Sequence, residues 1–245
     1  MQDHNLLTGH QWQPLSEYGL THKFWTLNTD TLIGSIIVSS LLILFSLYAY
    51  VVLHKKQSVA KFIILKYVEN FQNLLIQTLL NAPLNHLAFI GSLFTFILCC
   101  NIISVIPFIE EPTKDLNTTL ALGLISFFYV QGYAVVHNGI RAYLSNFLKP
   151  FALMLPLNIM GTLTSILSLS FRLFGNIFGG YIISSLYAQL ISSTYYFQIL
   201  GSLSGFNLFI FLAFGIFEGT IQAFVFSMLT LTYLSMEIVP EEESE

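Results

Sequence analysis

The sequence predicts an all-α, polytopic membrane protein with about five membrane helices, the last two forming a long tilted hairpin, plus an interfacial amphipathic helix. Three observations support this fold class. Hydrophobic residues make up 55% of the 245 residues and charged residues only 9%, with a mean hydropathy of +0.72. Such values lie outside the range of soluble globular domains. Several apolar runs reach the roughly 20 residues that cross a hydrocarbon core about 30 Å thick. Two of these runs are too long for a simple span.

The apolar segments predict the individual helices. Residues 32–53, 87–109 and 116–137 have the length of simple spans. Residues 150–190 and 203–237 would measure about 60 and 50 Å as straight helices at 1.5 Å per residue. Each must therefore tilt steeply or kink, and Pro156 and the pair Gly179 and Gly180 are candidate bends. Polar and apolar residues alternate at helical spacing between residues 59 and 80, which predicts the interfacial helix.

Basic residues in the loops predict the orientation. Four lysines lie in residues 54–70, and Arg141 and Lys149 lie in the loop 138–149, which marks both loops as cytoplasmic. We therefore expect an outside N-terminal segment (residues 1–31), a membrane domain (residues 32–237) and an acidic cytoplasmic tail (residues 238–245). The formal net charge is -4 and there is no basic patch, so nucleic acid is not an expected partner.

One arginine interrupts the fourth long apolar segment. Between residues 150 and 236 the only residues normally charged at neutral pH are Arg172 and Glu218. Arg172 shares one helical face with polar and small residues, namely Asn158, Gly161, Ser165, Ser168, Asn176 and Gly179. A face of the fifth segment likewise carries Ser204, Asn207, Gly215, Glu218, Gln222 and Tyr233. Two such faces on adjacent helices indicate a common hydrated surface.

The simpler interpretation is a buried structural ion pair between Arg172 and Glu218, with small residues that only allow close helix packing. Against it, a bilayer arginine costs at least about 2.5–3.5 kcal/mol to insert, and intramembrane charges tend to mark ion or substrate paths.

A fixed guanidinium can also ionise a neighbouring acid. At about 4 Å and an effective dielectric near 20 the attraction is roughly 4 kcal/mol. That lowers the pKa of a buried acid by about three.

Three stretches resemble subunit a of the F-type ATP synthase, in its bacterial form. They are "LSFRLFGNIFGG" (169–180), "GTIQAFVFSMLTLTYLSM" (219–236) and "PTKDLNTTLALGL" (112–124). The resemblance extends from about residue 83 to residue 236. It implies a stator subunit beside a rotating ring of subunit c (the c-ring), whose helices each carry a carboxylic acid near mid-membrane. It also implies contacts with the peripheral-stalk subunit b and other ATP synthase subunits, in a bacterial plasma (inner) membrane.

In that family the arginine matching Arg172 separates two half-channels and forces each passing ring carboxylate to ionise, and the glutamine matching Gln222 lies near it. The predicted topology assigns the remaining residues to sides. We expect Glu218, Asn176 and Asn207 to line the outer half-channel, with Asp115 and Asn117 near its mouth. We expect Asn158, Ser165 and Ser168 to hydrate the inner one. Asp115 is equally well explained as a solvated helix cap.

Three positions depart from the family pattern, one of them Ile166, where members commonly carry a proline. Bacterial members commonly carry an acidic residue at the position of Tyr181 and a histidine or acid at that of Gly215, and Glu218 is the candidate substitute.

There is no G-x-x-x-x-G-K-[ST] pattern, so we expect ATP chemistry in other subunits and no cofactor here. Two alternatives stay open. One is a stand-alone secondary transporter that binds an anionic substrate at Arg172, and the other is a non-conducting assembly subunit.

Overall fold

The computed structural model describes residues 11–12, 27–54, 58–79, 85–103, 111–148, 152–192 and 211–238. Apart from a two-residue antiparallel pair, β1 (Gln11–Trp12) and β2 (Leu27–Asn28), the elements of these residues are helical. Five helices are long and apolar enough to cross a membrane. They are α1 (Thr29–Leu53), α3 (Asn85–Ile102), α4 (Leu116–Asn138), α6 (Leu155–Ser192) and α9 (Glu218–Ile238). The predicted fold class, an all-α polytopic membrane protein, is confirmed.

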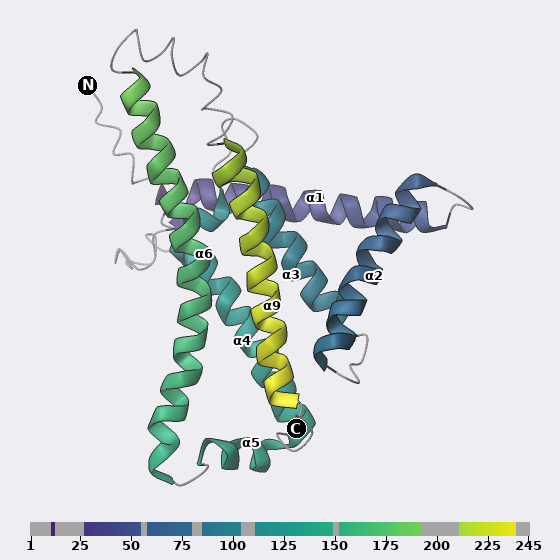
Figure 1. Cartoon of the computed structure of the whole chain (residues 1–245), viewed down its shortest axis with the longest axis vertical. Coiled ribbons are helices and arrows are strands. Elements are labelled where there is room, and N and C mark those ends of the chain that lie inside the picture. Colours follow the sequence, from purple (N-terminus) through teal and green to yellow (C-terminus); the bar gives the residue numbers. More distant parts are fainter. Residues whose placement is uncertain are drawn as a thin grey trace.

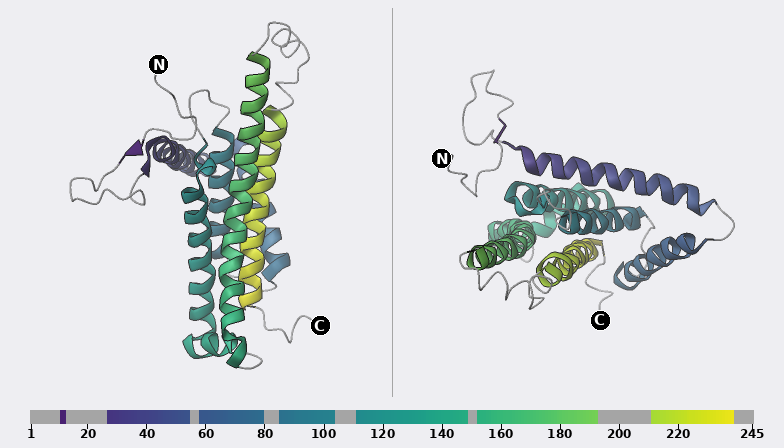
Figure 2. Two further views of the ribbon diagram at one scale, coloured as in Figure 1. Left: turned by 90° about the vertical axis from the view of Figure 1, so that its left-hand side faces the viewer. Right: turned by 90° about the horizontal axis from the view of Figure 1, so that it is seen from above.

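Helices α3, α4, α6 and α9 form the packed body, and α1 lies crosswise to α4, α6 and α9 (Figures 1 and 2). Because α1 and α6 cross, they cannot both run along the membrane normal. Helix α1 has 25 residues and measures about 37 Å, whereas α6 has 38 residues and measures about 57 Å. Helix α1 therefore fits the hydrocarbon thickness, whereas α6 exceeds it. Tilt of α6 relative to the membrane stays our expectation from its length.

The sequence left open whether the fourth segment tilts or kinks, and α6 is one uninterrupted helix. It passes through Gly179 and Gly180 without a break. Pro156 is its second residue, within the first turn, where proline's missing N–H removes no intrahelical hydrogen bond. Of the two explanations, a break at these positions is absent, which leaves tilt as the expected one.

The fifth segment is more complex than predicted. A π-helical turn, η6 (Phe211–Phe217), leads directly into α9. Such wide turns are rare and are frequent near functional sites. The first part of the predicted segment, residues 203–210, lies outside the described residues.

The stretch 138–149, predicted as a loop, contains a short helix, α5 (Ile140–Phe147). Gly139 ends α4 with a φ of 81°, a conformation that favours glycine, and the chain turns into α5. Figure 1 shows α5 bridging the lower ends of α4 and α6, beside the end of α9. Eight residues are too few to stand out from a loop by periodicity alone, so this helix was not predicted within the connection.

The interfacial helix predicted at residues 59–80 is α2 (Val59–Leu79). The side of α2 that faces the packed body buries Leu75 and Leu79, while Phe62 and Ile63 are exposed. The main core lies among α3, α4, α6 and α9, and its fully buried members include Ile97 and Leu173. This core fixes which face of α6 remains available.

Candidate functional site around Arg172

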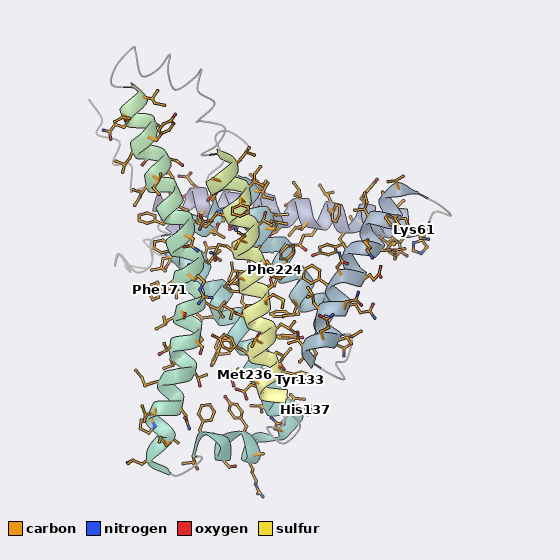
Figure 3. All side chains as sticks on the ribbon, viewed as in Figure 1. Lys61, Tyr133, His137, Phe171, Phe224 and Met236 are labelled. Carbon is orange, nitrogen blue, oxygen red and sulfur yellow. The ribbon has the colours of Figure 1, made fainter. Side chains whose placement is uncertain are left out.

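Arg172 lies near the middle of α6, and its side chain is exposed. The opposite side of α6 is packed and buries Ile166, Leu169, Ser170, Leu173 and Ile177. The neighbouring Phe171 is 51% exposed and points away from α9 (Figure 3). The guanidinium is therefore presented on the open side of a helix that is anchored by its other side.

Arg172 makes no hydrogen bond or ion pair with any residue that the structure describes. Glu218 is among those residues, and it is half-buried at the start of α9. The structural alternative, a buried ion pair between Arg172 and Glu218, is therefore absent in this arrangement. The six other polar and small residues predicted on the face of Arg172 are also not buried, namely Asn158, Gly161, Ser165, Ser168, Asn176 and Gly179.

The start of α9 is held by a buried polar contact. Asn101 of α3 donates a hydrogen bond from Nδ2 to the Gly219 carbonyl at 3.0 Å, and its Oδ1 accepts one from Thr113 Oγ1 at 2.7 Å. A Cβ on Gly219 would lie 2.8 Å from Asn101 Cβ, so the close approach requires glycine. This contact fixes the backbone next to Glu218. Gln222, one turn further along α9, is only 7% exposed.

Asp115 caps α4. Its Oδ1 accepts a hydrogen bond from the Asn117 backbone N–H at 3.0 Å, which confirms the helix-cap interpretation. Its Oδ2 accepts a hydrogen bond from Thr31 Oγ1 at 3.4 Å, so the beginning of α1 and the connection between α3 and α4 lie together. The Asn117 side chain is exposed.

Tyr181, which departs from the family pattern, contacts a cation. The Lys114 ammonium lies 3.7 Å from the centroid of the Tyr181 ring, within the range of a cation–π interaction. Lys114 ends η4 (Pro112–Lys114), the short turn before α4. The second half of α6 is thereby connected to the same end of the molecule as Asp115.

A cavity of about 370 Å³ lies among α4, α5, α6 and α9. Leu157, Gly161 and Met236 line it and are exposed, so it opens to the surface. Leu169 lines it three residues before Arg172. Its polar lining groups are Ser126 and Gln131 of α4, Tyr143 of α5, Asn158, Thr162 and Ser165 of α6, and Thr230, Tyr233 and Glu237 of α9.

Side chains at the α5 end of the cavity are joined by hydrogen bonds. Tyr143 Oη donates to Gln131 Oε1 at 2.7 Å, and Gln131 Nε2 lies 3.5 Å from Glu237 Oε1. Burial, and secondarily the Glu237 carboxylate, raises the pKa of the Tyr143 phenol above its ordinary value. Tyr143 is therefore a neutral donor over a wide pH range.

The structure gathers the predicted site residues into two groups. Asn158 and Ser165 meet at the cavity, and Ser168 is exposed one turn before Arg172. Glu218 and Asp115 lie at the opposite end, linked through Gly219, Asn101 and Thr113. Asn176 is half-buried, one turn past Arg172. Asn207 lies outside the described residues.

Sequence reasoning missed several polar residues of these two groups. Asn101 is a lone amide in an apolar span, a signal that could have been read as an intramembrane polar contact. Gln131 and Tyr143 carry no such signal, because they come together only through the turn at Gly139. Glu237 is the last residue of the predicted fifth segment (203–237) and was given no role, yet it lies in the last turn of α9 beside the cavity.

These features define a polytopic helical membrane protein with an arginine on an open helix face that is unpaired within the described ranges. Residues 32–235 match the family model described as ATP synthase A chain. The chain is similar to ATP synthase subunit a 2 of Acaryochloris marina, with 36% identity over 65% of this chain and 64% of the relative. ATP synthase subunit a of Moorella thermoacetica is 32% identical over 72% of this chain and 75% of the relative. The chain belongs to the ATP synthase A chain family.

The match to several relatives is partial. It covers 57% of the length of ATP synthase subunit a of Nitrosospira multiformis and 65% of that of ATP synthase subunit a 2 of a Picosynechococcus strain. The matched family model nevertheless includes Arg172, Glu218, Gln222 and the residues that line the cavity, except Met236 and Glu237. The family is therefore assigned over the part of the chain that carries the site.

Proposed function

We propose that this chain is the proton-conducting stator subunit of an ATP synthase Fo motor, in which Arg172 ionises the carboxyl groups of a passing c-ring. The observation that carries this proposal is the exposed guanidinium on a helix whose other side is packed. An arginine that faced lipid alone would cost at least about 2.5–3.5 kcal/mol. Arg172 therefore requires a polar or charged neighbour beyond the described residues, and a ring carboxyl group would fulfil that requirement.

The chemistry is a proton exchange on the ring. A carboxylic acid that faces lipid has a raised pKa and stays neutral. Close to Arg172 the attraction of roughly 4 kcal/mol at about 4 Å favours the carboxylate, so the acid gives its proton to water in one half-channel. After passing Arg172 the carboxylate takes a proton from water in the other. Arginine suits this role because it keeps its own proton where a buried lysine can lose it.

The inner half-channel corresponds to the cavity among α4, α5, α6 and α9. Asn158 and Ser165 line this cavity, and Ser168 extends the polar path toward Arg172. In the proposed orientation the α5 end is cytoplasmic, which agrees with the exposed Arg141 on α5 and the positive-inside rule.

The outer half-channel would begin at the opposite end. Asp115 and Asn117 lie at its mouth, and Glu218, Asn176 and Asn207 would lead inward to Arg172. Asp115 contacts Thr31 at the start of α1, which supports an outside N-terminal segment. The acidic tail would then be cytoplasmic, in a bacterial plasma (inner) membrane. We expect the peripheral-stalk subunit b and the other ATP synthase subunits to bind elsewhere on the surface.

The test is Arg172→Ala in inverted membrane vesicles that contain the whole complex. We expect normal amounts of assembled complex and no ATP-driven proton uptake, because the ring acids are no longer ionised at the stator. Ser185→Ala, an exposed position on the same helix, is the matched control and should pump normally. Coupled pumping by Arg172→Ala would disprove the mechanism.

A further inference from the structure

Among the described residues that line the cavity between α4, α5, α6 and α9, one carries a carboxyl group. That residue is Glu237, in the last turn of α9. The other titratable side chains among these lining residues are the phenols of Tyr143 and Tyr233. Glu237 is partly exposed, so it borders both the cavity and the surface at the α5 end.

The cavity is large and polar enough to hold water. Its volume of about 370 Å³ corresponds to about a dozen water molecules at their share of the liquid volume. Ser126 lines it, is 2% exposed, and its hydroxyl has no hydrogen-bond partner among the described residues. Buried hydroxyls are nearly always hydrogen-bonded, so this hydroxyl indicates water in the cavity.

Glu237 is held in position from two sides. Asn138 Nδ2 donates a hydrogen bond to its backbone carbonyl at 2.9 Å, which connects the end of α4 to the end of α9. Gln131 Nε2 faces its Oε1 at 3.5 Å, and Gln131 is itself oriented by Tyr143. The carboxylate is thus placed at the cavity by three helices, unlike the side chain of a solvated tail.

We propose that Glu237 is the proton-exchange group between the water of the inner half-channel and the cytoplasmic surface. Its carboxylate takes a proton from a hydronium ion at the surface, which leaves a water molecule. The resulting acid passes that proton to a water molecule in the cavity, which becomes hydronium and restores the carboxylate. The same two transfers run in reverse when protons leave toward the cytoplasm. This inference rests on the proposed function of the chain.

The test compares Glu237→Gln with Glu237→Asp in inverted vesicles that contain the whole complex. Glutamine keeps the size and an acceptor for Gln131 but cannot exchange a proton, whereas aspartate keeps the carboxyl group. We expect Glu237→Gln to slow ATP-driven proton uptake on the order of tenfold. This is less than the 10²–10⁴ typical of general acid–base groups, because water alone provides a slower route. Glu237→Asp should keep most of the rate.

Glu69→Gln is the matched control, because Glu69 is an exposed carboxylate of α2 that pairs with Lys66 at 3.2 Å. It should pump like the wild type. Equal pumping by Glu237→Gln and the wild type would overturn this inference alone. Equal losses in Glu237→Gln and Glu237→Asp, with less assembled complex, would also overturn it, by showing a structural role. Absence of pumping by the wild type would instead refute the proposed function.

Discussion

Asn101 and Arg172 are both polar residues in apolar helices, and their surroundings are opposite. Asn101 is completely buried, and its amide group bonds to Gly219 and Thr113. Arg172 is exposed and has no partner among the described residues. The polar contact that the chain completes by itself holds helices together, because an unpaired buried polar group is costly. Arg172 has no such contact among the described residues, and we infer that it is available to another subunit.

The same contrast extends along the two sides of α6. On the buried side Gly123 of α4 approaches so closely that a Cβ there would overlap Ser170 Oγ. On the open side Gly161 and Gly175 have nothing within 4 Å of such a Cβ. One side of α6 is closely packed against this chain, and the other is open among the described residues, as the proposed contact with the c-ring requires.

The largest expected effect on the packed region is that of Asn101→Ala. It leaves the buried Thr113 hydroxyl without its partner, at about 1–3 kcal/mol, and removes the hydrogen bond from Asn101 to the Gly219 carbonyl, typically about 0.5–1.5 kcal/mol. We expect less of the subunit to stay in the complex after heating in detergent, measured by immunoblot. Ser92→Ala, an exposed position on the same helix, should have no effect. Full thermal resistance of Asn101→Ala would show that this contact does not hold α9.

Gly123→Ala should have a smaller effect on the same measurement. The added methyl group must displace Ser170, and overpacking typically costs about 1–3 kcal/mol. Part of this is offset by the better helix propensity of alanine, by up to about 1 kcal/mol. Gly132→Ala on the same helix gains the propensity without the clash, since nothing lies within 4 Å of its Cβ. Equal stability of the two variants would show that α4 and α6 do not pack this closely at Gly123.

Glu218→Gln addresses the open region and should have the smallest effect. Glu218 makes no hydrogen bond with any described residue, so we expect normal assembly. ATP-driven proton uptake should slow partially, by roughly two- to tenfold, because other polar groups of the outer path still carry protons. Thr220→Ala, exposed on the same helix, serves as the control. An unchanged rate in Glu218→Gln would show that the outer path runs elsewhere.

Much of the fold could be predicted because it follows from apolar length. The starts and ends of α1, α2 and α4 agree with the predicted segments within about three residues, since each change from polar to apolar residues is sharp. Helix α5 was missed because eight residues give too short a pattern. The π-helical turn was missed because no sequence pattern marks its hydrogen-bond register as clearly as a change from polar to apolar residues marks a helix end.

The candidate site was predictable only where one residue was unusual by itself. Arg172 stood out as the one charge of its helix, and its helical face followed from periodicity. The partners of Asn101, Gln131 and Glu237 depend on contacts between residues about 100 positions apart or on a turn between helices. No local pattern encodes such contacts, so the cavity and its hydrogen bonds required the structure.

Disulfide cross-linking to the ring tests the central claim most directly, namely that the open side of α6 around Arg172 faces the c-ring. Cys99 and Cys100 are first replaced by alanine, and a cysteine is placed next to the ring carboxyl group. One turn before Arg172, Ser168→Cys is exposed, whereas Leu173 is fully buried and Leu173→Cys serves as the comparison. We predict that Ser168→Cys cross-links to the ring and Leu173→Cys does not. Cross-linking by Leu173→Cys alone would contradict the account.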